Sequence, residues 1–127
     1  MHDKHLYEYS VVRYVPRVER EEFINVGLIM MCKRKRWLRI AIEPDFKKIE
    51  AIGSSHTKED IVNQLSGLKL VAEGDRQGGA IAELDVTERF RWLSAVRSAC
   101  IQTSRPHPGI CDNLDTAFDN LVNELVR

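Results

Sequence analysis

Three segments in the first third of the chain have the residue pattern of β-strands. Residues 6–15 are rich in Tyr and Val without a helical period, and residues 36–42 place Leu38, Ile40 and Ile42 on one face of a strand. Residues 23–32 are apolar on both alternating faces, which is typical of a central strand. Asn25 and Gly27 share one of these faces in a regular strand. We expect Asn25 to hydrogen-bond neighbouring backbone, because a buried amide needs a partner, and Gly27 to let another backbone come close.

Helical spacing of apolar residues dominates the rest of the chain. Helices are expected after Pro44, after a capping Thr57, from about residue 85 to 100, and most clearly over 114–126. Residues 80–84 could add a short strand, and the two prolines in 105–109 predict a structured loop. Strands first and helices later predict an α+β fold, with an antiparallel sheet of N-terminal strands and helices packed on one face.

Length and composition set the domain organisation and the compartment that we expect. A chain of 127 residues is expected to be a single domain, 1–127, with 1–5 frayed at the terminus and 73–79 forming a flexible loop. No apolar run reaches the roughly 18 residues of a membrane helix, and the first residues lack an apolar leader. These features predict a cytoplasmic protein.

The charge balance and the spacing of possible metal-ligating residues argue against two classes of function, nucleic-acid binding and metal binding. Lys plus Arg and Asp plus Glu both number 19, so no overall field attracts nucleic acid. The basic run Lys33–Arg36, with Arg39 and Trp37, could contact phosphates and stack a base, but a solubilising hairpin tip explains it as well. The three cysteines form no Cys-x-x-Cys pair, so we expect no metal site and no cofactor.

Two polar clusters are the candidate binding surfaces. The first holds Arg17, Arg20, Glu22 and Asn25; the second holds Arg89, Arg97, Ser98, Gln102 and His107. Arginines beside a cleft could bind an anionic group bidentately, whereas Arg–Glu pairs on a surface would be only weakly stabilising. A His near a Ser also suggests a nucleophile and its base, but no orienting third group or nucleophile elbow accompanies them.

The same clusters carry a family resemblance. The chain reads Arg-Tyr-x-Pro at Arg13–Pro16, Arg-x-Glu-Arg-x-Glu-Phe-x-Asn-x-Gly at Arg17–Gly27, Glu-Arg-Phe-x-Trp-Leu-x-Ala-x-Arg-Ser at Glu88–Ser98, and Gln-x-Ser-x-x-His-x-Gly at Gln102–Gly109. In these motifs and in its closing amphipathic helix it resembles the bacterial family known as domain of unknown function 3037. Members of that family resemble small proteins encoded beside HipA-type kinases. The resemblance implies an accessory or regulatory partner and no assigned chemistry.

The leading hypothesis is therefore a non-catalytic interaction domain. Its polar clusters would form one surface for a protein partner, such as a HipA-type kinase, or for an anionic ligand. Homo-oligomers are compatible with this hypothesis. One alternative is a small enzyme acting on a phosphorylated or nucleotide substrate, with His107 as acid–base and arginines as phosphate clamps. Another is a nucleic-acid-binding module that uses residues 33–39.

Overall fold

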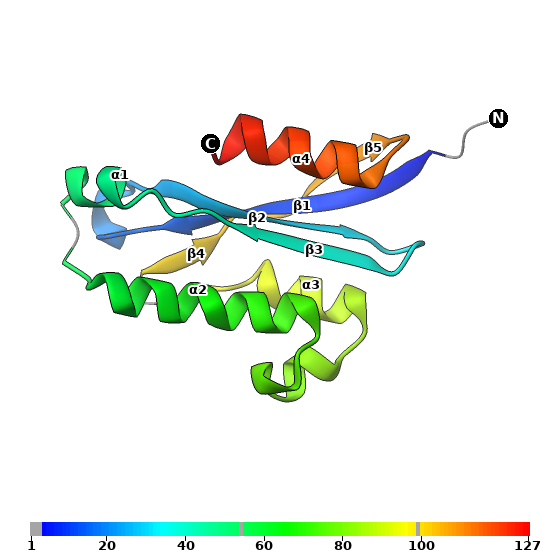
Figure 1. Ribbon diagram of the computed structural model, residues 1–127, viewed down its shortest axis with the longest axis horizontal. Coiled ribbons are helices and arrows are strands. Elements are labelled where there is room, and N and C mark those ends of the chain that lie inside the picture. Colours follow the sequence, from blue (N-terminus) through cyan, green and yellow to red (C-terminus); the bar gives the residue numbers. More distant parts are fainter. Residues whose placement is uncertain (1–3, 54, 99) are drawn as a thin grey trace.

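The computed structural model describes residues 4–53, 55–98 and 100–127, which form one antiparallel sheet flanked by helices (Figure 1). The strands are β1 (His5–Tyr14), β2 (Ile24–Cys32), β3 (Trp37–Ile42), β4 (Ile101–Thr103) and β5 (His107–Cys111). The order is β3-β2-β1, and both β4 and β5 pair with the outer side of β1. The predicted sheet of N-terminal strands is thus confirmed, and the α+β class with it.

Helices cover both faces of this sheet. The helices are α1 (Phe46–Ala51), α2 (Lys58–Glu73), α3 (Val86–Leu93) and α4 (Leu114–Leu125). Helices α2 and α3 lie below the sheet in Figure 1, and α4 lies above it. The prediction that the helices share one face therefore holds for α2 and α3, whereas α4 is on the opposite face. The physical reason is the apolar character of both faces of β2, each of which has to be removed from water.

Two apolar clusters correspond to the two faces. Val12, Tyr14, Ile29 and Met31 pack with α1, α2 and α3, in a cluster that also includes the fully buried Phe90. On the other face, Val11, Leu28 and Met30 pack under Phe118, Val122 and Val126, at the end of the chain. No helix among the described residues is both long and apolar enough to cross a membrane.

A β-bulge at Val26 breaks the regular alternation of β2. Val12 pairs with Gly27, but the next residue, Arg13, pairs with Asn25, so Val26 is an extra residue on β2. Val26, Ile29 and Met31 consequently lie on the α2 face. The prediction that Asn25 shares a face with Gly27 is therefore wrong, because the extra residue turns Asn25 toward α4.

The predicted N-terminal cap of α2 is confirmed, and α1 has a capping residue of the same kind. The side chain of Thr57 accepts a hydrogen bond from the backbone N–H of Asp60 at the start of α2, and Asp45 caps α1 in the same way. Gly53, just past the end of α1, has a φ of 86°, a left-handed conformation that commonly terminates helices.

Other segments differ from the predictions. Residues 80–83 form a 3₁₀ helix instead of a strand, and α3 ends at Leu93 although apolar spacing continues to Cys100. His107–Cys111 is a strand at the sheet edge rather than a loop, where Pro108 needs no ladder hydrogen bond. The expected flexible loop 73–79 contains a short 3₁₀ helix, Arg76–Gly78. Of the terminal residues expected to fray, 1–3 lie outside the described residues, and His5 already pairs with Cys111.

Candidate anion-binding site

The bulge lines up four polar residues across the sheet. Asn25 pairs with Arg13 on β1, Arg13 pairs with Gln102 on β4, and Gln102 forms a β-bridge with Arg97. Residues directly opposite each other in antiparallel strands project to the same face, about 5 Å apart. The row Asn25–Arg13–Gln102–Arg97, which we call the arginine row, therefore lies on the α4 face. It combines three predicted site residues with Arg13.

Arg13 is the half-buried member of the row. Its guanidinium lies over the ring of Phe23, 4.2 Å from the ring centroid, and its buried Nε has no hydrogen-bond partner among the described residues. Burial, and after it the positive charge of Arg97, lowers the pKa of Arg13 below its ordinary value. The Phe23 ring offsets part of this cost by a cation–π contact.

Arg97 is held through one nitrogen, Nη1. Its Nη1 donates to the carbonyl oxygens of Val96 and Thr103, both at 2.6 Å, and this holds the exposed side chain beside Gln102. Within the described part of the chain, neither Arg97 nor Arg13 forms a salt bridge with a carboxylate. Two neighbouring cations without such a partner there form an environment that an anion would stabilise.

Asn25 anchors the inner end of the row to α4. Its Nδ2 donates to the carbonyl oxygen of Leu125 at 2.9 Å, at the last turn of that helix. The expected bond to backbone is present, although the residue is half-buried and its acceptor is 100 positions away along the chain. The Oδ1 atom of Asn25 is buried and has no partner in the part of the chain that the structure describes, so these residues satisfy the amide only in part.

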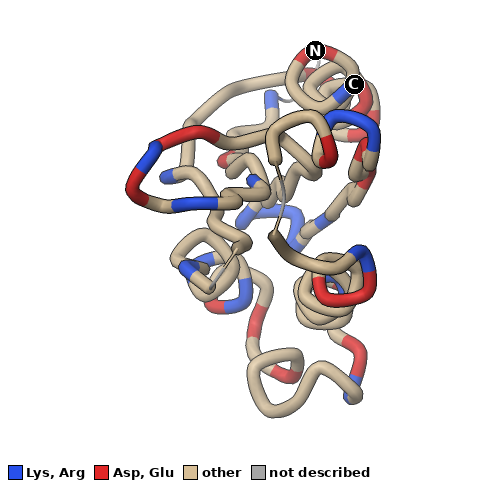
Figure 2. Tube along the Cα trace, turned by 90° about the vertical axis from the view of Figure 1, so that its left-hand side faces the viewer, with Lys and Arg blue, Asp and Glu red and all other residues tan. Residues whose placement is uncertain are grey.

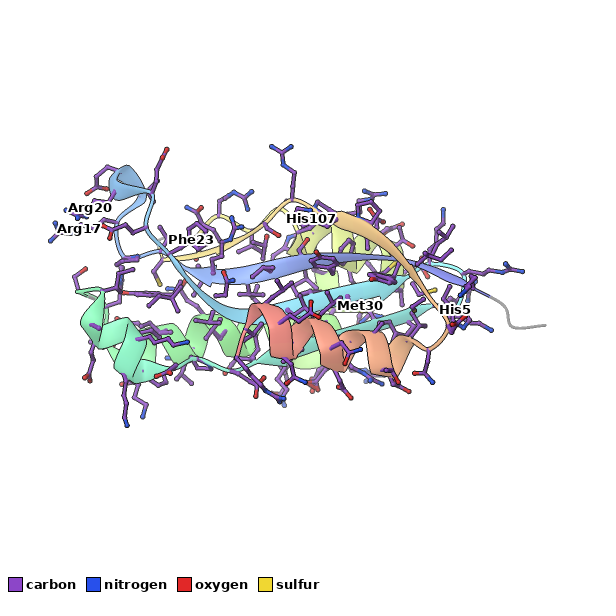
Figure 3. The ribbon with its side chains drawn as sticks, turned by 90° about the horizontal axis from the view of Figure 1, so that it is seen from above. His5, Arg17, Arg20, Phe23, Met30 and His107 are labelled. Carbon is purple, nitrogen blue, oxygen red and sulfur yellow. The ribbon has the colours of Figure 1, made fainter. Side chains whose placement is uncertain are left out.

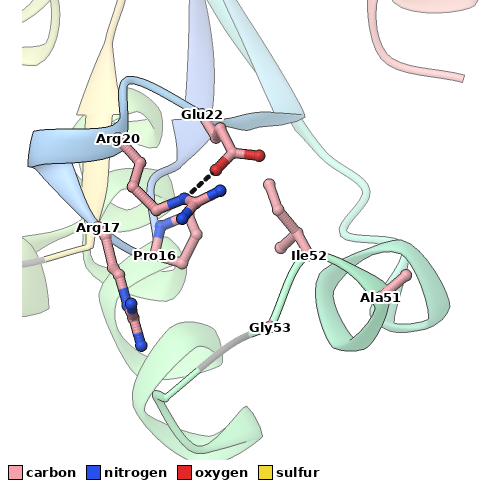
Figure 4. A pocket seen from close by; sticks show the side chains of 7 residues that line it. All are labelled: Pro16, Arg17, Arg20, Glu22, Ala51, Ile52 and Gly53. Carbon is pink, nitrogen blue, oxygen red and sulfur yellow. Dashed lines mark hydrogen bonds and ion pairs between the residues drawn. The ribbon is translucent and has the colours of Figure 1, made fainter.

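The other predicted residues of the first cluster lie in a separate pocket. Arg17, Arg20 and Glu22 line a surface depression of about 280 Å³ together with the end of α1 (Figure 4). Arg20 forms an exposed ion pair with Glu22, and this contact raises the pKa of Arg20. An exposed pair of this kind contributes little to stability.

Two residues of the second cluster have internal partners. Arg89 donates from Nη1 to the carbonyl oxygens of Val71 and Ala72, and so satisfies the C-terminal end of α2. The hydroxyl of Ser98 donates to Oε1 of Gln64 at 2.6 Å and accepts a hydrogen bond from the backbone N–H of Ile101 at 3.0 Å. Both arrangements tie α2 to the segments that follow it.

His107 lies farther along the sheet than the arginine row. It pairs with Tyr9, whose ring centroid is 5.2 Å from the imidazole. Tyr9 precedes Arg13 by four positions, which corresponds to about 13 Å along a strand. Figure 3 shows Arg17 and Arg20 at the tip of the β1–β2 connection, Phe23 nearer the sheet, and His107 beyond it. The predicted single surface is thus divided among several places.

The basic hairpin tip and its aromatic neighbour also separate. Lys33, Arg34 and Arg36 line a pocket of about 590 Å³ with the start of β1 and of α3. Trp37 instead packs edge-on against Phe118 under α4, where Arg39 contacts both rings. Trp37 is therefore engaged in the fold rather than presented beside the basic side chains. Figure 2 shows acidic and basic positions interspersed along the chain.

Comparison with models of known protein families identifies the family of this chain. The family model described as protein of unknown function (DUF3037) matches residues 9–126. The chain belongs to the DUF3037 family. Comparisons with curated proteins and with solved structures gave no match.

Arg13 and Phe23 were missed as site residues in this DUF3037 chain. Both stand inside the motifs that carry the family resemblance, but neither was assigned to a binding surface. A signal was available for Arg13, since it is a cation within the otherwise apolar end of a strand. For Phe23 the sequence gives no such signal, because an aromatic residue beside a strand is ordinary core material.

Replacing Asn25 with leucine should lower the free energy of unfolding by about 1–3 kcal/mol, because the Leu125 carbonyl loses its donor. Urea denaturation followed by circular dichroism would measure the change. Asn63→Leu is the matched control, since Asn63 is exposed on α2 and should shift stability by no more than about 0.5 kcal/mol. Equal effects of the two substitutions would show that the bond to α4 contributes nothing.

Proposed function

We propose that this DUF3037 chain is a non-catalytic binding domain that recognises an anionic group on a protein partner through the arginine row. The observation that carries the proposal is the pair Arg13 and Arg97, which flank Gln102 on one face with no carboxylate bound to either in the described residues. A guanidinium fork matches the geometry of a carboxylate or a phosphate.

The electrostatics of the row favour an anion over a neutral ligand. Burial and, after it, the positive charge of Arg97 lower the pKa of Arg13. A phosphate or carboxylate placed between the two arginines would oppose the effect of that charge and accept hydrogen bonds from their guanidinium groups. Gln102 could add an amide donor, and the exposed ring of Phe23 could cover the apolar part of the bound group.

The separation of the candidate catalytic groups supports a binding role over an enzymatic one. His107 lies against Tyr9, whereas the hydroxyl of Ser98 is occupied by Gln64 and the backbone N–H of Ile101. A general base has to reach the group that it deprotonates, either directly or through one water. These two residues lie on different elements with different partners.

The partner we propose is an intracellular protein that carries a phosphate or a clustered carboxylate. A HipA-type kinase is the first candidate to test, because the family resembles small proteins encoded beside such kinases. Co-purification from the native host with the parent chain and with Arg97→Gln as baits would identify partners that depend on the arginine row.

Titration with a defined anion tests the site itself. We expect inorganic phosphate and O-phosphoserine to shift the arginine Nε–H NMR signals of Arg13 and Arg97 in a saturable way, with acetate as the carboxylate probe. Arg97→Gln should weaken binding at least about tenfold, since a charge-assisted hydrogen bond contributes about 1.5–3 kcal/mol.

Arg17→Gln is the matched control, because Arg17 is exposed and lies in the separate pocket. An unchanged melting temperature of Arg97→Gln would show that the variant is folded. The proposal is wrong if the anions give no saturable shift, or if Arg17→Gln weakens binding as much as Arg97→Gln.

A further inference from the structure

The two edges of the sheet are built differently. On one side, the edge is divided between β4 and β5, with Pro106 between them and Pro108 inside β5. Arg97 additionally forms a bridge to the outer side of β4. Short strands and prolines are the devices by which natural sheets prevent another strand from adding to an edge.

The opposite edge, β3, has none of these devices. Its six residues, Trp37–Ile42, are continuous and contain no proline and no lysine. The backbone N–H of Glu43 donates to Val26 on β2, and donors alternate in direction along an antiparallel strand. The backbone groups of Leu38, Ile40 and Ile42 therefore point away from the sheet. Among the described residues, no backbone group outside the sheet bonds to these three.

The surface beside this edge is apolar. Leu38, Ile40 and Ile42 are half-buried against α2, and a groove of about 280 Å³ runs between the end of β3 and α2. Val62 lines this groove and is 40% exposed. An added strand would thus satisfy the free backbone groups and at the same time remove apolar surface from water.

The charges at the two ends of β3 indicate what the added strand is. The exposed basic turn Lys33–Arg36 precedes β3, whereas the exposed Asp45 follows it. Glu43, next to Asp45 at this end, is already paired with Arg127 of the same chain. If a second β3 pairs antiparallel with the first, centred on Ile40, Lys35 of each copy lies opposite Asp45 of the other. Such self-complementary surfaces are typical of two-fold dimers.

We propose that β3 pairs with β3 of a second copy of this chain, so that one continuous sheet runs through a two-fold symmetric dimer. This interface is on the edge away from Arg97, so it leaves both arginine rows accessible. Neither the dimer nor its test depends on the anion-binding role.

Sedimentation equilibrium tests the dimer directly. We expect the mass to rise from one to two times 14.6 kDa between low micromolar and roughly millimolar concentration, the range of a weak specific complex. Val62→Lys should weaken dimerisation at least tenfold, because it places a like charge on each side of the two-fold axis. Val18→Lys is the matched control, since Val18 is 56% exposed but lies in the β1–β2 connection.

A second variant, Ile40→Pro, tests the backbone pairing between the two copies independently of the apolar groove. Ile40→Pro removes an N–H that points away from β2, so the β2–β3 ladder stays intact while the proposed intermolecular ladder loses a donor. We expect a folded monomer by circular dichroism. The proposal is overturned if the parent chain stays monomeric throughout, or if a folded Val62→Lys variant and a folded Ile40→Pro variant both dimerise like the parent.

Discussion

Replacing Phe90 with alanine should lower the free energy of unfolding by about 3–5 kcal/mol, a large fraction of the total stability of a small domain. Phe90 is 0% exposed and belongs to the cluster in which α2 and α3 meet the sheet. Truncation to alanine removes the apolar contacts and leaves a cavity, because well-packed neighbours relax only partly.

Urea denaturation would measure this loss, and Trp92→Ala on the same helix supplies the control. Trp92 is 43% exposed, so its truncation leaves a surface gap that water fills rather than an internal cavity. We expect Trp92→Ala to cost much less than Phe90→Ala. Similar losses for both variants would mean that Phe90 is not at the centre of the core.

Replacing Gly27 with alanine should destabilise the fold by about 1–3 kcal/mol or more, although only one methyl group is added. A Cβ at this position would lie 2.5 Å from the carbonyl oxygen of Ala41 and 3.1 Å from Cδ1 of Ile42. The first contact is with backbone, so relief requires β3 to move relative to β2. The expectation that another backbone lies close to Gly27 is thereby confirmed.

Gly67→Ala is the opposite case and serves as the control for the same chemical change. Gly67 lies within α2, and a Cβ there would meet nothing within 4 Å. Alanine in place of glycine should stabilise the helix by up to about 1 kcal/mol. A neutral Gly27→Ala variant in thermal melts would contradict the close approach of β3.

The sheet and most helices could be predicted because their signals are local. A few neighbouring positions suffice to recognise the apolar run of β2, the two-residue period of β3, the helical spacing over 114–126 and the capping residue Thr57. The side of the sheet that α4 covers depends instead on total apolar area, which no single segment reveals. Likewise, β5 was missed because Pro106 and Pro108 indicate a loop until an edge of β1 is available to pair with.

The candidate site could be predicted only in part, because it depends on strand register. Asn25, Gln102 and Arg97 were selected from their motifs, but what brings them together is their alignment with Arg13. Arg89 is equivalent to Arg97 in the sequence, and each donates from Nη1 to two carbonyl oxygens; they differ because Arg97 stands opposite Gln102 at the sheet edge, whereas Arg89 lies at the end of α2. Contacts of this kind are non-local and leave no spacing pattern.

The extra residue at Val26 shifts the alternation of side chains between the two faces of β2. Residues 28–32 alternate regularly, and residues 24–25 lie on the faces opposite to those that this alternation would give them. A regular strand of the same sequence would put Val26 opposite Arg13 and turn Asn25 toward the apolar cluster beneath α2, so the arginine row would lose its inner end. A chain that lacked Val26 would need no bulge, because Asn25 would directly precede Gly27 in regular alternation and still stand opposite Arg13. The position of Asn25 therefore depends on how the backbone accommodates one extra residue, and an insertion or deletion between Asn25 and Gly27 would change the shape of β2 more than a substitution of Val26.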